Sequence, residues 1–208
     1  MEARTTPPTR RGVGRPGDHE DVRGAILAAA LRQLEATGSP DRVTIAAIVD
    51  EAGCTPPSLY HYWPRRELLL REASERGWAQ FRTSQADAVA EHGNPVERLR
   101  RRGRAYLDFA LARPALFRVL FLEPRADAGS SRPSGETGDA LHDLIADVTA
   151  AMGSGQIRPA DPFATALALW SAMHGVAALW AATPNLPADL AHAVGNLSQD
   201  AVLRGLSS

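Results

Sequence analysis

The fold of this chain is decided by residues 43–63, which read VTIAAIVDEAGCTPPSLYHYW. Thr44 is a favourable N-cap residue, because its side-chain oxygen can accept a hydrogen bond from a backbone N–H of the first helical turn. It precedes a predicted short helix over residues 45–52, whose inner face is formed by Ile48 and Val49. The stretch therefore opens with a short, capped, amphipathic helix.

A second short helix follows after a tight turn at Gly53. Glycine suits the left-handed backbone of such a turn, and Thr55 can cap the helix that comes next. Two prolines fall in the first turn of that helix, where a missing N–H costs nothing. Leu59 and Trp63 lie four residues apart and would seat the helix on an apolar core. Its opposite face then presents Pro56, Pro57, Ser58, His61 and Tyr62.

A longer helix precedes this pair. From about residue 19, apolar side chains recur at helical spacing, with Ile26, Ala30 and Leu34 four residues apart, until a Gly-Ser-Pro sequence at 38–40 ends the helix. Three helices in this order have the layout of a helix-turn-helix unit, whose last helix enters the major groove of DNA. We therefore expect a DNA-binding domain over residues 19–65.

The remainder of the chain has the same helical periodicity. Further helices are predicted over about 65–91, 96–112, 115–122, 141–153, 161–182 and 186–206, with a loop of Pro, Gly and Ser at 124–135. With no convincing strand and with short connections, the sequence predicts an all-α fold of about nine helices. Residues 66–208 form its larger helical domain. Residues 1–18 form a disordered basic arm, which either enters a minor groove or is a plain tail.

Composition limits the class of protein. The chain has 208 residues, 44% of them apolar, 23% charged, and a net charge of -1, as in ordinary globular proteins. Its one cysteine, Cys54, excludes a disulfide framework and a cysteine-rich zinc site, and the six histidines share no ligand spacing, so we expect no metal. No apolar run is judged long enough to span a bilayer, so we expect a cytoplasmic protein without a membrane partner. Arginines gather at 1–17 and 98–125, whereas 126–208 is acidic.

Residues 19–70 resemble the DNA-binding domain of TetR-type (tetracycline-repressor-like) transcriptional regulators. The likeness rests on the run from Ile26 to Leu31, on Gly38, and on the ungapped run from Val43 to Leu69. Three later runs resemble the C-terminal domain subgroup that is named for a Trp…His-Gly (WHG) signature. These runs are Tyr106–Ala110, Pro114–Phe121 and Trp170–Gly175.

The resemblance implies roles for individual residues. Thr44 and Tyr60 match positions that contact phosphate, and the outward face of the helix after Gly53 matches the base-reading positions. Tyr62 stands where the family usually has His, Arg66 where it usually has Lys, and Trp63 where it usually has Phe. The expected DNA-binding residues are Thr44, Thr55, Pro56, Pro57, Ser58, Tyr60, His61, Tyr62 and Arg66.

Aromatic side chains on three of the later helices suggest a ligand pocket. The expected lining residues are Tyr106, Phe109, Phe117, Phe121, Trp170 and His174. No Arg or Lys falls on the stripe from Trp170 to His174, which favours a small apolar or weakly polar organic ligand. Core packing explains each aromatic equally well, so a pocket and a filled core both remain open.

The predicted helix over 161–182 is apolar nearly all round, and such a helix must be covered on every side. A second copy of the chain, packed through this helix and the one over 186–206, would cover its outer side. We therefore expect a homodimer, and the resemblance implies the same arrangement.

Together these observations predict a ligand-responsive repressor that binds a pseudo-palindromic double-stranded DNA operator as a homodimer and needs no cofactor. Two alternatives remain. One is a DNA-binding regulator with a filled core and no ligand. The other is an all-α enzyme that uses His174 with a carboxylate such as Asp108, although no nucleophile with a base and an orienting group supports catalysis.

Overall fold

The computed structural model describes residues 16–123, 136–183 and 185–206. Over these residues it contains nine α-helices and no strand, which confirms the predicted all-α fold. The helices are α1 (Pro16–Thr37), α2 (Ile45–Ala52), α3 (Pro56–Tyr62), α4 (Arg66–Asp87), α5 (Pro95–Ala112), α6 (Pro114–Phe117), α7 (Glu136–Gly153), α8 (Pro162–Ala182) and α9 (Ala188–Leu206). A short 3-10 helix, η1 (Pro40–Arg42), and a π-helical turn, η2 (Arg118–Leu122), complete the elements.

The short helices α2 and α3 form where their caps place them. The hydroxyl of Thr44 accepts a hydrogen bond from the N–H of Ala47 at 3.2 Å, so the cap of α2 is made as predicted. Gly53 ends α2 in the left-handed region with φ 64°. Thr55 occupies the N-cap position of α3 in an extended conformation, and Pro56 opens the helix. The predicted cap by the Thr55 side chain is wrong, because its hydroxyl bonds to the hydroxyl of Ser58 and to no backbone N–H of the first turn. Local residue chemistry is therefore enough to set the bounds of both helices.

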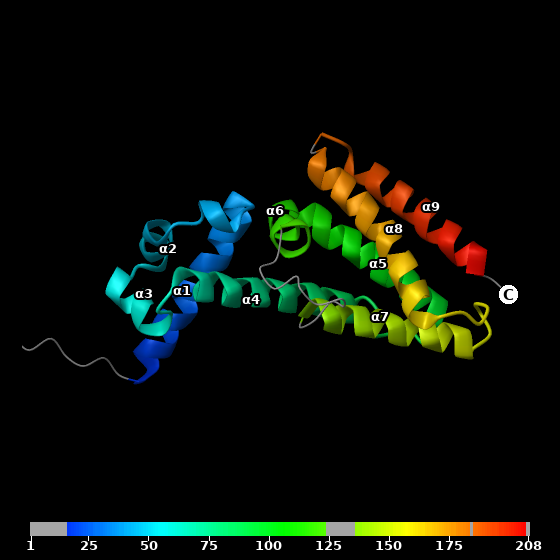
Figure 1. Ribbon diagram of the computed structural model, residues 1–208, viewed down its shortest axis with the longest axis horizontal. Helices are drawn as coiled ribbons and strands as arrows, with labels where there is room; N and C mark the ends of the chain where they lie inside the picture. The colour runs from blue at the N-terminus through cyan, green and yellow to red at the C-terminus, as the bar shows by residue number, and fades with distance from the viewer. Residues whose placement is uncertain (1–15, 124–135, 184, 207–208) are drawn as a thin grey trace, which may run out of the picture.

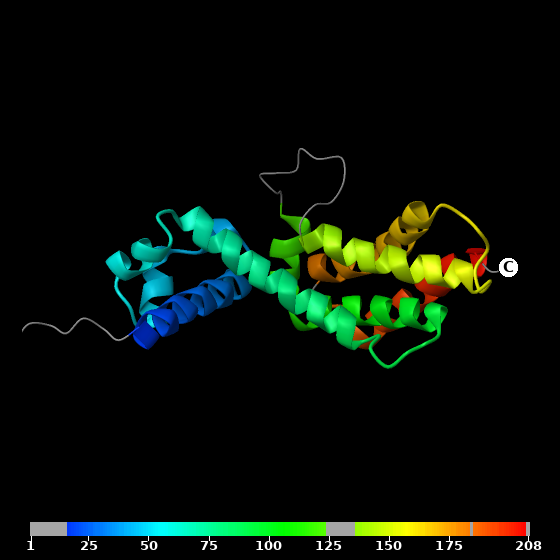
Figure 2. The same ribbon diagram turned by 90° about the horizontal axis from the view of Figure 1, so that it is seen from below.

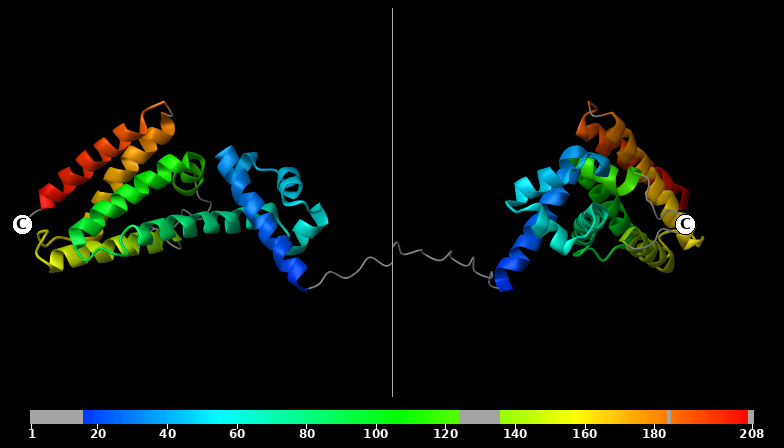
Figure 3. Two further views of the ribbon diagram at one scale, coloured as in Figure 1. Left: turned by 180° about the vertical axis from the view of Figure 1, so that it is seen from behind. Right: turned by 60° about the vertical axis from the view of Figure 1, so that its left-hand side comes forward.

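The elements fall into two groups that α4 joins (Figure 1). Helices α1, α2 and α3 lie at one end of α4, and α5 and α7 contact its other end, with α8 and α9 packed beyond α5. Figure 2 shows α4 crossing obliquely from one group to the other, with α7 alongside its second half. In Figure 3, α8 and α9 run side by side at the far edge of the larger group. Helix α4 is thus the element that both groups share.

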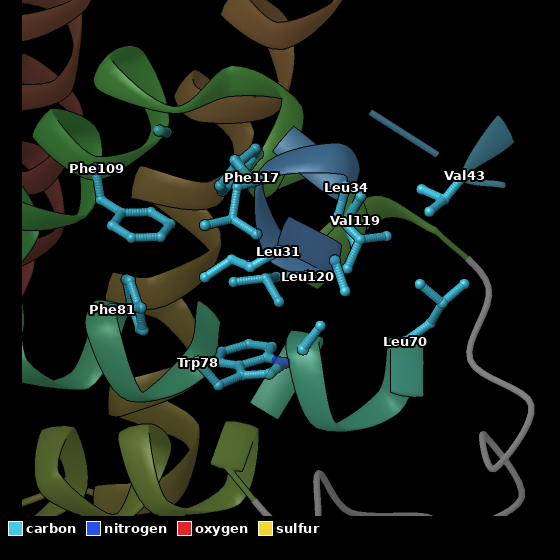
Figure 4. Packing of buried hydrophobic residues seen from close by; sticks show 14 of the residues in the cluster. Leu31, Leu34, Val43, Leu70, Trp78, Phe81, Phe109, Phe117, Val119 and Leu120 are labelled. Atoms are coloured by element: carbon cyan, nitrogen blue, oxygen red, sulfur yellow. The ribbon is translucent and has the colours of Figure 1, made fainter. Parts of the chain in front are cut away.

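One apolar core runs through the junction between the groups. Leu31 and Leu34 of α1 belong to the same buried cluster as Trp78 of α4, Phe117 of α6 and Leu120 of η2 (Figure 4). A second cluster lies among α5, α7, α8 and α9 at the far end of the molecule. The first core is therefore continuous between α1 and the larger group.

Helix α9 approaches α5 closely at two glycines. A Cβ on Gly195 would lie 2.3 Å from Cδ1 of Leu107, and a Cβ on Gly103 would lie 2.3 Å from Nε2 of Gln199. Real Cβ atoms do not approach other atoms so closely, so a side chain at either position would force Leu107 or Gln199 to move. The amide of Gln199 sits in this contact and donates to the carbonyl of Leu99 at 2.8 Å.

Several predicted boundaries shift. Helix α1 begins at Pro16 rather than 19, α4 ends at Asp87 rather than near 91, and α9 begins at Ala188 rather than 186. The predicted single helix over 115–122 is divided, because the backbone widens into the π-helical turn η2. The rest of the basic arm, residues 1–15, and the predicted loop at 124–135 lie outside the described residues.

The expectation that no apolar run is long enough to span a membrane is wrong, when length and composition are the only criteria. Among the described residues, α8 is long and apolar enough to do so. Core helices pass the same test, and α8 packs against α5, α7 and α9. Its apolar composition therefore has an explanation within the fold and does not indicate a membrane.

Candidate DNA-binding surface and ligand cavity

Helix α3 turns its predicted outer face to solvent. Leu59 is fully buried and Trp63 is 4% exposed, and together they seat the helix on α1 and α4. On the other side, Pro56, Pro57 and His61 are exposed, and Tyr60 is 45% exposed. The residues expected to face bases are thus presented together on one small helix.

The hydroxyl-bearing residues near the start of α3 are already paired. The Oγ atoms of Thr55 and Ser58 lie 3.0 Å apart and share a hydrogen bond, and the hydroxyl of Thr44 caps α2. Each hydroxyl keeps further hydrogen-bonding capacity for phosphate or base. Tyr62 is only half-exposed, and its ring lies 5.0 Å from that of His61 and 5.8 Å from that of Trp63.

Arg66 performs a structural task that the sequence did not reveal. Its Nε and Nη2 donate to the carbonyl of Val43 at 3.0 and 2.8 Å, and Nη2 also donates to the carbonyl of Pro40. The guanidinium therefore fixes the segment that leads into α2. Arg66 is one of the expected DNA-binding residues, and a guanidinium can bind phosphate through two N–H groups. Such a bidentate contact would compete with the bonds to these two carbonyls.

A polar network that sequence reasoning missed holds α3 to its neighbours. The indole N–H of Trp63 donates to Oε2 of Glu72 at 2.7 Å, and Arg23 of α1 pairs with Oε1 of the same carboxylate at 2.6 Å. The guanidinium of Arg23 also lies 5.0 Å from the centre of the Trp63 ring. A phenylalanine could not make the bond to Glu72, so Trp63 adds a link between α3 and α4.

The larger group of helices encloses an inner cavity of about 60 Å³. Its walls come from α4, α5, η2, α7, α8 and α9 and are mainly apolar. They are formed by Trp78, Phe81, Gln85, Leu99, Arg102, Gly103, Tyr106, Phe121, Ala140, Leu141, Leu144, Leu169, Trp170, Met173 and Gln199. An outer cavity of about 320 Å³ adjoins it and is lined by Trp78, Leu120, Phe121, Leu167, Trp170, Ser171 and His174. The two cavities share three aromatic walls.

Three predicted pocket residues form a hydrogen-bonded chain. The indole N–H of Trp170 donates to the hydroxyl oxygen of Tyr106 at 3.3 Å, and that hydroxyl lies 2.8 Å from Nδ1 of His174. Burial lowers the pKa of the His174 imidazole and raises the pKa of the Tyr106 phenol, so both groups are neutral near pH 7. The chain is therefore held together by neutral hydrogen bonds.

Four of the six predicted pocket residues line a cavity, namely Tyr106, Phe121, Trp170 and His174. Phe109 and Phe117 line neither of the two cavities and are buried in the first core cluster. The sequence missed Trp78 and Phe81, whose spacing places them on one face of α4, and it missed the polar residues Gln85, Arg102 and Gln199. Their positions depend on how helices far apart in sequence meet.

Arg102 brings a guanidinium to the wall of the inner cavity. Its Nε pairs with Oδ2 of Asp147, and Arg98 pairs with the other oxygen of that carboxylate. Asp147 is 1% exposed. Two guanidiniums therefore share one buried carboxylate, and these ion pairs join α5 to α7.

Asp108 does not form an acid–base pair with His174. It is exposed on α5, and its carboxylate lies 3.3 Å from Nε2 of His192 on α9. The particular pair that the enzyme alternative requires is therefore not assembled.

The outer surface of α8 and α9 carries large apolar side chains in the single chain. Leu179 is 53% exposed, Leu190 is 45% exposed and Leu197 is 64% exposed. Exposed apolar surface of this kind is typical of a region that another protein surface covers.

The molecule thus combines a helix-turn-helix unit, which presents an exposed third helix, with a helical domain that encloses an apolar cavity. This is the architecture of a DNA-binding regulator with a sensory domain. Residues 26–73 match the family described as "Bacterial regulatory proteins, tetR family", and residues 99–198 match the description "Tetracyclin repressor-like, C-terminal domain". The two matches cover more than two thirds of the chain, which therefore belongs to the tetR family of transcriptional regulators. The WHG subgroup assignment stays a prediction.

Solved structures are similar over almost the whole chain. A protein of unknown function from Rhodococcus sp. RHA1 is 26% identical, with a TM-score of 0.77, over 94% of this chain and 100% of that one. A TetR-family regulator from Pectobacterium atrosepticum is 22% identical, with a TM-score of 0.68, over 93% and 98%. The regulator FadR from Bacillus subtilis, solved with stearoyl-CoA, is 16% identical, with a TM-score of 0.70, over 88% and 99%. A search of curated proteins found no match.

Proposed function

We propose that this regulator is a ligand-responsive repressor, which binds a pseudo-palindromic operator as a homodimer and releases it when a small organic molecule fills the cavity. One observation carries the proposal. Trp78 and Phe81, which line the cavity, lie on α4, and α4 also holds the recognition helix through Glu72. A single rigid helix therefore joins the ligand site to the DNA-binding site.

The DNA contacts in this proposal are the ones that the sequence predicted. Ser58 and His61 would contact base edges together with the two prolines, and Tyr60 and Thr44 would contact phosphates. In a dimer, two copies of α3 would lie in successive major grooves, and the operator would mirror the two-fold symmetry of the protein. The protein would act in the cytoplasm, where the DNA is.

The second subunit would cover the apolar surface of α8 and α9. Leu179, Leu190 and Leu197 lie on that surface and are exposed in the single chain. A two-fold symmetric interface, in which α8 and α9 pack against α8 and α9 of the second subunit, would bury these three leucines. Dimerisation would also set the distance between the two copies of α3.

The ligand would be a small, mainly apolar molecule. A molecule that occupies both cavities must displace or rotate Trp78, Phe121 or Trp170, because these rings stand between the two spaces. Moving Trp78 shifts α4, and a shifted α4 changes the separation of the recognition helices. A ligand that binds the shifted state better than the DNA-bound state would release the operator.

The test begins with selection of bound sequences from random duplex DNA. We expect a palindromic consensus whose half-sites lie about one helical turn apart. The selected duplex then serves in a screen for compounds that both raise Tm and release the DNA. A non-palindromic consensus would refute the dimeric operator. A palindrome without any releasing compound would leave the alternative of a regulator with no small-molecule ligand.

A further inference from the structure

The inner cavity is a narrow slot that runs parallel to α5. Its α5 walls, Leu99, Arg102, Gly103 and Tyr106, follow the spacing of one helix face over two turns, which is about 10 Å of helical rise. On α4, Trp78, Phe81 and Gln85 also lie on one face over two turns. The free volume of about 60 Å³ is smaller than a hydrocarbon chain of that length, so such a chain would enter along this line of contact only as the lining side chains move apart.

The outer cavity is wider and has a different chemistry. Its lining includes one imidazole and one hydroxyl, those of His174 and Ser171, among five apolar or aromatic side chains. Trp78, Phe121 and Trp170 separate this space from the slot. A molecule with a slender tail in the slot would therefore place its head beside His174.

The hydrogen-bonded chain fixes which proton His174 presents. An indole N–H can only donate, so the oxygen of Tyr106 accepts from Trp170. We assign the Tyr106 O–H as the donor to Nδ1 of His174, because this arrangement gives the buried phenol proton an acceptor within 2.8 Å. Nδ1 is then an acceptor, and the ring proton resides on Nε2. Burial lowers the pKa of His174 and keeps the ring neutral. The imidazole thus offers the outer cavity one neutral N–H donor.

The polar groups along the slot are committed to the protein. Arg102 is paired with Asp147, and the amide of Gln199 donates to the carbonyl of Leu99. With its amide oriented to satisfy its neighbours, Gln85 bonds to the backbone of Arg102 and Tyr106. The slot itself therefore favours hydrocarbon. Because Arg102 is committed to Asp147, a charged head group would lose its water without gaining a free counter-ion, so an uncharged acceptor is favoured beside the His174 donor.

From this arrangement we infer that the inducing ligand is an uncharged acyl compound. Its unbranched chain of roughly eight carbons would fill the slot along two turns of α5. Its carbonyl oxygen, in an ester or thioester, would accept the hydrogen bond from Nε2 of His174. This inference rests on the proposed function and names the ligand class of the same site.

Calorimetric titration of the full-length protein with four probes of similar length tests the inference. The probes are methyl nonanoate, nonanoate, nonylamine and decane. We expect methyl nonanoate to bind at least tenfold more tightly than the other three, because it alone is uncharged and has a carbonyl acceptor. Within a series of methyl esters, affinity should rise about fourfold per methylene and stop rising near an eight-carbon tail.

Variants separate the role of His174 from general packing. His174→Phe keeps a ring but removes the donor and should lose about tenfold for the ester, with no loss for decane. His174→Gln restores an N–H and should regain part of the ester affinity. His142→Phe, which changes an exposed histidine of α7 outside both cavities, is the matched control. Leu144→Phe, which narrows the slot, should shift the optimum to shorter esters.

Each contrary result is distinct. Tighter binding of nonanoate than of its methyl ester would indicate that Arg102 recognises the ligand and would overturn the inference. Equal binding of the ester and decane would also overturn it. Binding of no probe would also overturn it. The proposed function would survive any of these results if the palindromic operator is bound and a compound of another class releases it, and it would fail if operator binding itself is absent.

Discussion

Trp63→Phe should loosen the recognition helix by removing its bond to α4. A hydrogen bond to a charged group contributes about 1.5–3 kcal/mol. The side chain of Glu72 is 30% exposed and keeps its partner Arg23, so the lower end of this range applies. The smaller ring also leaves a gap beside Leu59, which adds about 1 kcal/mol. We expect a total loss of about 2–3 kcal/mol in the free energy of unfolding.

A double-mutant cycle with Glu72→Gln isolates the bond from the gap. The coupling energy between the two positions should be about 1 kcal/mol, because Glu72→Gln leaves one neutral amide oxygen for the two donors Trp63 and Arg23 and so weakens the same bond that Trp63→Phe removes. Glu75→Gln is the matched control: it lies on the same helix, pairs with Arg71 and should not couple to Trp63. Chemical denaturation at one fixed protein concentration gives the free energies, since stability of a dimer depends on concentration.

Operator affinity supplies the second readout of this cycle. If the bond orients α3, Trp63→Phe should weaken binding to the selected operator more than binding to random DNA. Additive effects of Trp63→Phe and Glu72→Gln, within about 0.5 kcal/mol, would refute the reasoning. An equal loss on both kinds of DNA would show that Trp63 stabilises the domain without orienting the helix.

Three further predictions follow from the sites. Arg66→Ala should lower Tm as well as the affinity for every DNA sequence, since it releases the carbonyls of Val43 and Pro40. His61→Ala should leave Tm unchanged and relax base preference by about 1–3 kcal/mol at one position. Thermal unfolding and sequence selection distinguish these two outcomes. Leu197→Asp should give monomers in sedimentation, because it places a charge in the proposed interface, whereas Asn196→Asp on the same helix should remain dimeric. Partial burial lowers the pKa of His174 below that of the unfolded chain, so the unfolded chain takes up a proton more readily and stability should fall as the pH drops below about 6.5. His174→Gln should flatten that part of the Tm profile, and an unchanged profile would contradict the assigned burial effect.

The DNA-binding half was readable from sequence because short-range rules determine it. The Thr44 cap, the Gly53 turn and the prolines of α3 act within a few residues, and the bounds of α2 and α3 agree with prediction. The role of Arg66 was not readable. Its partners are backbone carbonyls 23 and 26 residues away, and carbonyls carry no signal in side-chain identity.

The cavity was only partly readable, for the same reason. The aromatic residues of α5, η2 and α8 correctly indicated that these elements form walls of the cavity. Phe109 and Phe117 are aromatic like Phe121, but they pack in the core. Which aromatic faces a void depends on the rotation of each helix, and the π-helical turn η2 changes that rotation just before Phe121. Gln85, Arg102 and Gln199 meet only because α4, α5 and α9 converge.

The contacts around α4 explain why its motion would be transmitted. Glu72, which holds α3, and Trp78, which lines both cavities, are six residues apart, or about 9 Å along one helix. Between them, a Cβ on Gly77 would lie 3.0 Å from Cδ1 of Leu116, so α6 rests directly on the α4 backbone. Helix α6 in turn contacts α1, where Ala115 lies beside Gly38. A ring displaced by ligand at Trp78 therefore pushes against α6 and α4 together, and a close-packed core transmits such a push instead of absorbing it.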